Sequence, residues 1–325
     1  MKEINSILCV ITSWQDAPTS IAQSLNLAQD HQATLSFLIF PEEEAAAEIP
    51  LLDDELYQNG ISQLAENEKL KLGRQVQAID PSVEYSVEVL SGTVFIDVIR
   101  AVKRNQHDLV IKCAEDTDWL DRMFGSDDMH LFRKCPCPVL MLKPGQTGEF
   151  RSVLATVDVD DEPSDPDKAQ TQLNLNRQVL KYSAALCMPE LSDLHVASVW
   201  RAFAERFMRD SAFSHASDDK VDNYVQNKQL KCSAALDGLI AELADELGSE
   251  GMGYLDAKKH LIKGRASREI PRIAKELGSD LVVMGTVGRT GIPGLLIGNT
   301  AESILEQVQC SVLGIKPDGF ESPID

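Results

Sequence analysis

The chain contains an internal repeat, and this repeat limits the possible folds more than any other feature. An octapeptide starting at Cys137 (CPVLMLKP) and another starting at Cys310 (CSVLGIKP) match at an offset of 173 positions. Residues 108–111 (DLVI) and 280–283 (DLVV) match at an offset of 172. A chain built in this way is expected to fold as two copies of one unit.

The sequence offset between the two copies is smaller at their starts than at their ends. Residues 7–11 (ILCVI) resemble 153–157 (VLATV) at an offset of 146, so the second copy is 26 residues longer in its first half. We expect these extra residues in the polar segment 201–224. Because a short polar stretch, GQTG, separates the copies, we expect a first domain at 1–146 and a second at 147–325.

Within each copy, short apolar runs alternate with helical patterns. Apolar residues recur at the i, i+3, i+4 spacing of a helix face at Ile270, Ile273, Ala274 and at Ala301, Ile304, Leu305. The strand candidates are apolar almost throughout, which is typical of parallel strands buried on both faces. Alternating strands and helices indicate right-handed βαβ crossovers. The sequence therefore predicts the α/β class, with two tandem doubly wound parallel-sheet domains.

A glycine-rich stretch follows the predicted strand at 281–284. It holds five glycines in 14 residues and runs up to an amphipathic helix that starts near Thr300. Ligands in such folds bind beyond the carboxyl ends of the strands. Glycine lets backbone N–H groups approach a phosphate, a helix start adds further N–H groups, and Arg289 supplies a cation. The stretch therefore predicts a phosphate-binding loop.

A purely structural interpretation of this stretch also stands. It is neither a complete Walker A motif nor a complete dinucleotide fingerprint. Glycines also serve ordinary turns, and Asn299 with Glu302 forms a variant of the capping box. The residues alone leave both interpretations open.

The spacing Gly285-x2-Gly288-x9-Gly298, followed by a small polar residue and a helix, resembles the universal stress protein family. The segments GTVGRTG and GNTAE are most similar to its tandem E-type (UspE-like) members. The first copy retains Gly125-Ser126 at the matching place, so the resemblance covers nearly the whole chain as two tandem family domains. It implies the adenine nucleotide α-hydrolase-like fold of that family in both copies.

The resemblance also implies a ligand, ATP or another phosphate-bearing small molecule, in the second copy. The family's strand-end acid falls on Asp158, and its adenine-side strand residue falls on Val199. The phosphate-binding positions fall on Gly285, Gly288, Arg289, Gly298, Asn299 and Thr300. Asn299 stands where the family has Ser or Thr, although its amide can still donate to a phosphate.

The first copy departs from this pattern. Thr12 stands in place of the strand-end acid, and Cys113 and Asp116 replace the first two glycines. Four acidic residues lie between positions 115 and 121, and their charge would repel phosphates. We predict that the first copy binds no nucleotide and acts as a structural or partner-binding half.

Two short apolar segments, 139–142 and 312–315, are candidate edge strands, and exposed edges need a partner. The family resemblance implies that such strands pair antiparallel between two domains. In this chain the pairing would join the two copies within one molecule, as a pseudo-dimer.

Metal, disulfide and catalytic sites are not expected. Seven cysteines lack the Cys-x-x-Cys spacing, and we expect them to be buried thiols; Cys135 and Cys137 would share one face of a strand. Six histidines show no His-x3-His spacing, and His195 is interpreted as a core residue. With no Gly-x-Ser-x-Gly elbow and no organised base, at most a slow ATPase activity is expected.

The charge restricts the partners. The 51 acidic and 31 basic residues give a net charge of −20, which disfavours binding to nucleic acids and to anionic membrane surfaces. No apolar run approaches the length of a membrane span, and the first residues do not resemble a secretory signal. A cytoplasmic location is therefore expected.

Taken together, these features predict a cytoplasmic tandem universal stress protein that acts in stress tolerance by binding a nucleotide-like molecule, ATP, in its second domain. The alternative is a scaffold or carrier without an ATP function, whose second domain holds an apolar or sugar-nucleotide ligand. Phe203, Phe207, Met208 and Phe213 would then line an enlarged pocket, or else pack against the sheet.

Overall fold

The computed structural model describes residues 4–42, 54–114, 127–146, 149–160, 165–209, 217–255, 257–286 and 297–325. These residues form two compact units. The N-terminal unit comprises the described parts of Glu3–Glu149, Gly291–Ile297 and Gln309–Asp325; the C-terminal unit comprises those of Phe150–Thr290 and Gly298–Val308. The units follow contacts in space, whereas the repeats follow the sequence, so the repeat boundary at 146 and 147 stays a prediction.

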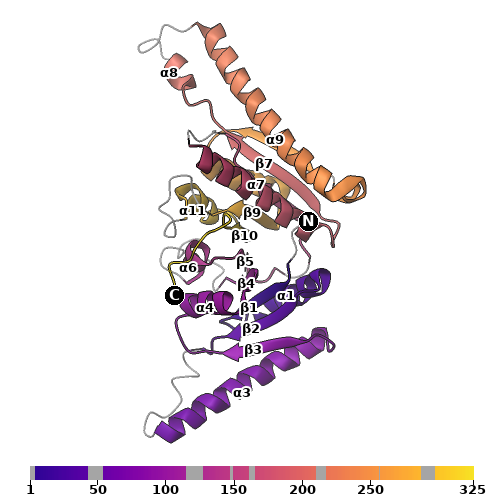
Figure 1. Ribbon diagram of the computed structural model, residues 1–325, viewed down its shortest axis with the longest axis vertical. Coiled ribbons are helices and arrows are strands. Elements are labelled where there is room, and N and C mark those ends of the chain that lie inside the picture. Colours follow the sequence, from indigo (N-terminus) through magenta and orange to yellow (C-terminus); the bar gives the residue numbers. More distant parts are fainter. Residues whose placement is uncertain are drawn as a thin grey trace. The chain divides into compact units, whose positions relative to one another are not determined.

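The N-terminal unit is built on a sheet with the strand order β3-β2-β1-β4-β5-β10 (Figure 1). Its strands are β1 (Ser6–Ile11), β2 (Thr34–Ile39), β3 (Tyr85–Val89), β4 (Leu109–Cys113), β5 (Val139–Leu142) and β10 (Ser311–Ile315). The pairs β1–β2, β2–β3, β1–β4 and β4–β5 are parallel. This is the doubly wound arrangement that the sequence predicts, since the chain crosses to either side of β1.

The helices of this unit are α1 (Ala17–His31), α3 (Asp54–Ile79), α4 (Val94–Asn105) and α6 (Asp127–Lys134). Helix α1 packs on β1, β2 and β4 and contacts α3, while α4 contacts α6. In Figure 1, α1 and α4 lie on opposite sides of the strands. Both faces of the sheet are therefore covered, which explains why β1, β4 and β5 are almost entirely buried.

The last strand of each repeat pairs with the other, as expected. Strand β10 runs antiparallel to β5, with Val312 opposite Met141 and Gly314 opposite Val139. Although β10 comes from the second repeat, it thus belongs to the same compact unit as the first. The pairing covers an edge that β5 would otherwise expose.

The C-terminal unit contains parallel strands in the order β9-β6-β7-β8. Their bounds are β6 (Ser152–Thr156), β7 (Asp193–Trp200), β8 (Lys258–Lys263) and β9 (Leu281–Gly285). The helices are α7 (Pro166–Cys187), α8 (Glu205–Arg209), α9 (Asp218–Leu255), α10 (Ala266–Leu277) and α11 (Asn299–Leu305). Helices α7 and α9 contact each other and the strands, and α10 contacts α11. The helical spacing predicted at 270–274 and 301–305 is confirmed.

The extra length of the second repeat is divided between two places. The offset between matching strands rises from 146 at β1 and β6 to 159 at β2 and β7, and reaches 172 at β4 and β9. Half of the extra residues therefore precede β7, where α7 has 22 residues against 15 in α1. The other half lie between β7 and β9, a stretch that includes the expected segment 201–224, so the expectation holds in part.

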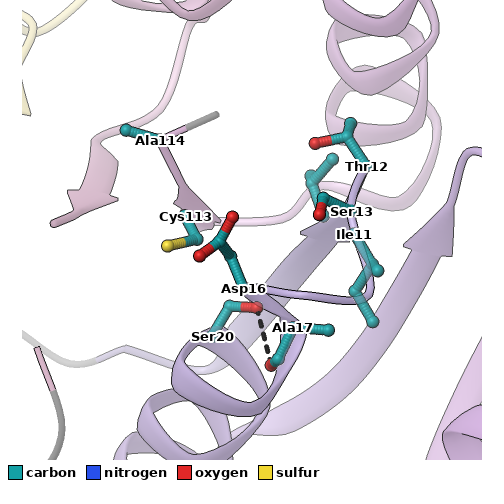
Figure 2. A pocket seen from close by; sticks show the side chains of 9 residues that line it. Ile11, Thr12, Ser13, Asp16, Ala17, Ser20, Cys113 and Ala114 are labelled. Atoms are coloured by element: carbon teal, nitrogen blue, oxygen red, sulfur yellow. Dashed lines mark hydrogen bonds between the residues drawn. The ribbon is translucent and has the colours of Figure 1, made fainter. Parts of the chain in front are cut away.

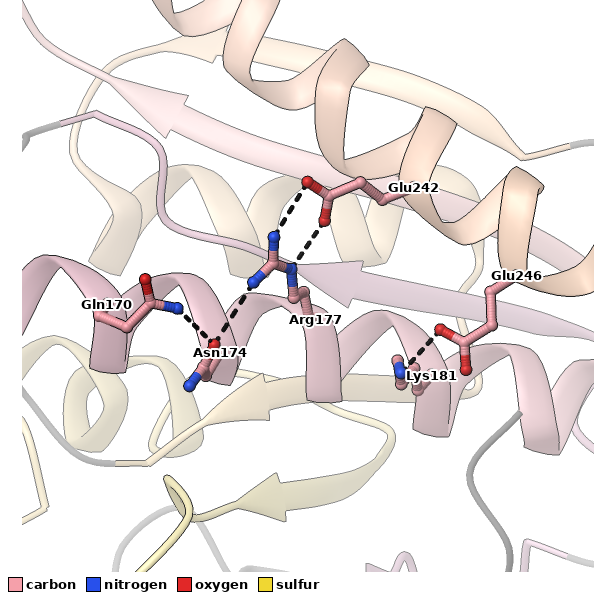
Figure 3. Close-up of polar contacts among 6 residues, drawn as sticks. All are labelled: Gln170, Asn174, Arg177, Lys181, Glu242 and Glu246. Atoms are coloured by element: carbon pink, nitrogen blue, oxygen red, sulfur yellow. Dashed lines mark hydrogen bonds and ion pairs between the residues drawn. The ribbon is translucent and has the colours of Figure 1, made fainter.

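The two long helices are joined by ion pairs (Figure 3). Arg177 of α7 donates two hydrogen bonds to Glu242 of α9, at 2.7 and 3.1 Å, and Lys181 pairs with Glu246 at 2.7 Å. Exposed pairs of this kind contribute about 0.2–1 kcal/mol each. These two ion pairs therefore fix how α7 and α9 align with each other, and they add little to the free energy of unfolding.

All seven cysteines are buried free thiols, as the sequence suggested. Of the helices within the described ranges, none combines the length and apolar character needed to cross a membrane.

Candidate functional site

The strand register of the C-terminal sheet places three of the predicted site residues at matching positions along neighbouring strands. Thr156 of β6 pairs with Ala197 of β7 and with Met284 of β9. Two residues further along each strand, the chain reaches Asp158, Val199 and Thr286. All three lie at the carboxyl ends of parallel strands, which is where ligands bind in open α/β sheets.

The backbone at Asp158 is fixed by a buried asparagine of α7. The Asp158 N–H donates to Asn176 Oδ1 at 3.0 Å, and Asn176 Nδ2 donates to the Asp158 carbonyl at 2.8 Å. Asn176 is 4% exposed, so these hydrogen bonds do not compete with bulk water. The Asp158 carboxylate accepts a hydrogen bond from the Asp160 N–H at 3.3 Å. The side chain of Asp158 thus starts from a rigid backbone position.

Helix α9 also contacts the loop after β6, through residues that lie close to Asp160. Lys228 Nζ lies 3.4 Å from Asp160 Oδ1 and donates to the Asp160 carbonyl. The Cys232 thiol lies 3.9 Å from the same carboxylate. Asp160 is 8% exposed, and a buried carboxylate is costly without a compensating charge, which Lys228 of α9 supplies.

Val199 is half-buried and lies opposite Ile262 of β8. The next residue, Trp200, belongs to a buried cluster with Ala202 and Cys232. Since side chains alternate along a strand, Val199 points to the opposite face from Trp200. The structure therefore leaves Val199, and not the larger Trp200, available at the predicted adenine-side position.

Gly285 ends β9 and lies against α7. A Cβ at this position would come within 2.6 Å of a Leu175 methyl carbon, well inside van der Waals contact. Leu175 is itself 4% exposed, so it has little room to move. Close packing of α7 therefore accounts for this glycine, whether or not a ligand binds beside it.

The two ends of the glycine-rich segment meet. The Gly298 N–H donates to the Thr286 carbonyl at 3.0 Å, and Thr286 is buried. Gly298 is the N-cap of α11, and Asn299 and Thr300 are the first, exposed residues of that helix. The capping box with Asn299 as its cap is therefore wrong, because Asn299 already lies inside the helix. Gly288 and Arg289 fall outside the described residues.

The equivalent place in the first repeat holds a small cavity (Figure 2). Thr12 directly follows β1, Cys113 ends β4, and Asp16 directs its carboxylate toward Cys113. The cavity between them measures about 10 Å³, which leaves room for about one water molecule. Burial and the nearby Asp16 charge raise the pKa of the Cys113 thiol to about 12. Among the described residues that line the cavity, Asp16 carries a charge and none is basic. Asp116 and Gly125-Ser126 lie outside the described residues.

A buried ion pair takes the place of apolar packing beside this cavity. Lys112 of β4 is fully buried, and its Nζ lies 2.8 Å from Asp128 Oδ1 at the start of α6. The matching residues of the second repeat are Met284 and Ala301. Helix α6 begins with Asp127 and Asp128, and the second of these is the partner of Lys112.

Metal-ligand geometry is a separate question. In the part of the chain that the structure describes, no three His, Cys, Asp or Glu side chains are grouped so as to hold a metal ion.

Comparison with known proteins decides the family. The model of the universal stress protein family matches residues 3–143 and again 174–316. The chain belongs to the universal stress protein family. The two matched segments confirm that this universal stress protein is a tandem one.

Among its relatives is a universal stress protein E homolog from Haemophilus influenzae, 28% identical over 249 residues, which cover 73% of this chain and 72% of that protein. Universal stress protein E of Photorhabdus laumondii is 29% identical over 231 residues, covering 70% and 67%. The tandem chain is therefore similar to universal stress protein E.

Solved structures confirm the fold. A protein of unknown function from Pseudomonas aeruginosa PAO1 superimposes with a TM-score of 0.63 at 24% identity, covering 98% of this chain and 94% of that one. A universal stress protein from Archaeoglobus fulgidus gives a TM-score of 0.60 at 15% identity, covering 98% of both chains. Identities this low establish architecture alone.

Sequence reasoning missed two residues that hold the site together. Asn176 lies in the middle of a helix, and Lys228 lies 68 residues from Asp160. A polar residue on the buried side of a helical pattern was the available signal for Asn176. Nothing in the sequence near Lys228 points to Asp160.

Proposed function

We propose that the second repeat binds a nucleotide, ATP, at the carboxyl ends of its strands, and that the protein acts in stress tolerance in the cytoplasm through this binding. The observation that carries the proposal is the common level of Asp158, Val199 and Thr286 across three neighbouring strands. An acid, an apolar side chain and the start of a glycine-rich segment are thus placed side by side. These suit, in turn, a ribose hydroxyl, a base and a phosphate chain.

The phosphate part of the site rests on both ends of the glycine-rich segment. Thr286 and Gly298 are hydrogen-bonded, so the segment starts and ends at one fixed point, directly before α11. We assign Gly285, Gly288, Gly298, Asn299 and Thr300 to the phosphates. Arg289 adds a cation for the same group.

The first repeat is proposed to serve as the structural half. Its cavity has room for about one water molecule, and the Asp16 carboxylate lines it. Through the pairing of β5 with β10, the domains that we place at 1–146 and 147–325 form a pseudo-dimer in one chain.

The experiment is a calorimetric titration of the full chain with ATP. The Gly288→Val variant should weaken binding about tenfold or more, because a branched side chain blocks the approach of backbone N–H groups to the phosphates. Asp116→Val is the matched control, since Asp116 holds the place of Gly288 in the first repeat. It should leave the affinity unchanged. Equal losses in both variants, or none in Gly288→Val, would contradict the assignment.

A second candidate function, a carrier of an apolar or sugar-nucleotide ligand, is favoured by one observation. Phe203 and Phe207, beside the end of β7, are 56% and 58% exposed, so more than half of each residue's surface is open to solvent. Arg201 stacks on the Phe203 ring at 4.3 Å. Phe213 lies outside the described residues. Under this alternative, Phe203→Ser together with Phe207→Ser removes ligand binding, whereas Gly288→Val spares an apolar ligand.

A further inference from the structure

Two cysteines meet at the amino end of β5. Cys135 Sγ and Cys137 Sγ are 3.6 Å apart, and both thiols are buried. Each is followed by a proline, Pro136 and Pro138, and a residue before proline is confined to extended conformations. The two sulfur atoms are in van der Waals contact, about 1.5 Å beyond the length of an S–S bond. Both cysteines precede β5, so the expectation that they share one face of a strand is wrong.

A buried lysine from the second repeat lies across from this pair. Continuing the β5–β10 register by two residues places Lys316 opposite Cys137. Lys316 is 6% exposed, donates to the Phe132 carbonyl and lies 5.0 Å above the Phe320 ring. Burial lowers the pKa of Lys316 to about 7, although the nearby Cys135 opposes this shift. An amine of this kind accepts a proton at neutral pH.

The two thiols are chemically unequal. Burial opposes ionisation of Cys135, but the hydrogen bond from Cys137 and the charge of Lys316 lower its pKa. The hydrogen bond to Cys135, with burial, raises the pKa of Cys137. Cys135 is therefore the more readily ionised thiol of the pair and Cys137 the less readily ionised one, an arrangement that suits a nucleophilic and a resolving thiol.

We propose that Cys135 and Cys137 form a redox-active dithiol that small peroxides oxidise to a disulfide, with Lys316 as the positioning residue. Lys316 takes the Cys135 proton, and the thiolate attacks a peroxide oxygen. The O–O bond breaks, a sulfenic acid forms on Cys135, and the hydroxide leaves as water with the proton from Lys316. Cys137 then attacks the sulfenic sulfur, the S–O bond breaks, and a second water leaves. Two thiols lose two electrons, and hydrogen peroxide is reduced to two waters.

Oxidation at this place changes the surroundings of Lys316. The disulfide carries no charge, so a protonated Lys316 loses the thiolate that offsets its burial. Cys137 is 8% exposed and Cys135 is not exposed at all, so the oxidant must be small and must enter through local opening. The proposed oxidation therefore takes place directly beside the pairing of β5 with β10.

The second repeat provides an internal control. At the matching positions it carries Val308 and Cys310, so one of the two cysteines is missing. By the same register, Lys143 lies opposite Cys310, but Lys143 is exposed where Lys316 is buried. The first repeat alone therefore combines two adjacent cysteines with a buried amine.

The test treats the full chain with hydrogen peroxide, alkylates the remaining thiols after denaturation, and maps the products by peptide mass spectrometry. We expect a Cys135–Cys137 disulfide to form before any other cysteine reacts. Because all seven cysteines are buried, exposure alone cannot produce this selectivity. The Cys135→Val variant, which copies Val308, should leave Cys137 reduced. Oxidation spread evenly over the cysteines, or no disulfide at this pair, would overturn the proposal.

The role of Lys316 is tested by Lys316→Met, with Lys143→Met as the matched control. The first variant should slow disulfide formation about tenfold, because each pKa unit changes the thiolate fraction by that factor, and should move the pH profile of the rate upward. The control should change neither. Equal rates and pH profiles in wild type and Lys316→Met would remove Lys316 from the proposal.

Discussion

At Gly285, both the packing of helix α7 and the approach of a ligand require the absence of a side chain. An added Cβ would come within 2.6 Å of a Leu175 methyl carbon, so α7 needs a glycine here to lie close to β9. The same absence of a side chain would let a phosphate approach the backbone. The two demands can be separated by measuring stability and binding on one variant.

Gly285→Ala is expected to lower the free energy of unfolding by about 1–3 kcal/mol, because Leu175 must be displaced in a packed interface. Urea unfolding of the full chain measures this. Gly238→Ala is the control: Gly238 lies in α9 with nothing within 4 Å of an added Cβ, and it should gain up to about 1 kcal/mol of helix stability. If Gly285→Ala keeps its stability but loses ATP, the glycine serves the ligand alone.

The site could be predicted from the sequence only as far as its local residues reach. Asp158 and Gly298 lie beside strand ends that the apolar runs already reveal. Asn176 and Lys228 act across 18 and 68 residues, and their role depends on how α7 and α9 lie on the sheet. A contact of that kind is a consequence of tertiary packing, which no local pattern encodes.

At the scale of elements, strands and helices were predictable because their buried apolar residues recur at the spacing of a strand or a helix. The apolar run at 281–284 became β9, and the spacing around Ile273 became α10. The extra length of the second repeat was located only in part, because composition reveals the polar segment 201–224 but not the longer helix α7.

Strands β7 and β8 carry a histidine pair that makes the C-terminal unit sensitive to acid. His195 Nδ1 and His260 Nε2 are 2.9 Å apart. Burial lowers the pKa of His195, and the charges of His260 and Lys258 lower it further, against the opposing effect of Asp193. Burial and Lys258 likewise lower the pKa of His260. Both histidines are therefore neutral in the folded chain over a range where the unfolded chain is already protonated.

The direction of the pH dependence follows from the linkage between proton binding and unfolding. Because the unfolded state binds more protons just below about pH 6.5, the free energy of unfolding falls as the pH decreases through that range. We expect the urea midpoint of the wild type to drop between pH 7.5 and 5.5, and His260→Gln to show a smaller drop. The other five histidines, His195 included, remain in both proteins, so the difference reports the loss of His260 from the pair. An equal drop in both proteins would show that the pair does not titrate on unfolding.

At the scale of the whole molecule, duplication has left two unequal halves. The second repeat carries Asp158 and a glycine-rich segment after its strands, whereas the first carries Thr12, Cys113 and the buried pair Lys112–Asp128. The last strand of the second repeat completes the sheet of the first. One ligand site for each chain is the stoichiometry that this division of roles predicts.

Native mass spectrometry of the intact chain tests this central claim most directly, because it reports the small molecule that co-purifies and its stoichiometry. The account predicts a nucleotide, ATP or ADP, at one per chain, and its loss in Gly288→Val but not in Asp116→Val. Two nucleotides per chain, or a lipid-like or sugar-nucleotide ligand that survives Gly288→Val, would contradict it.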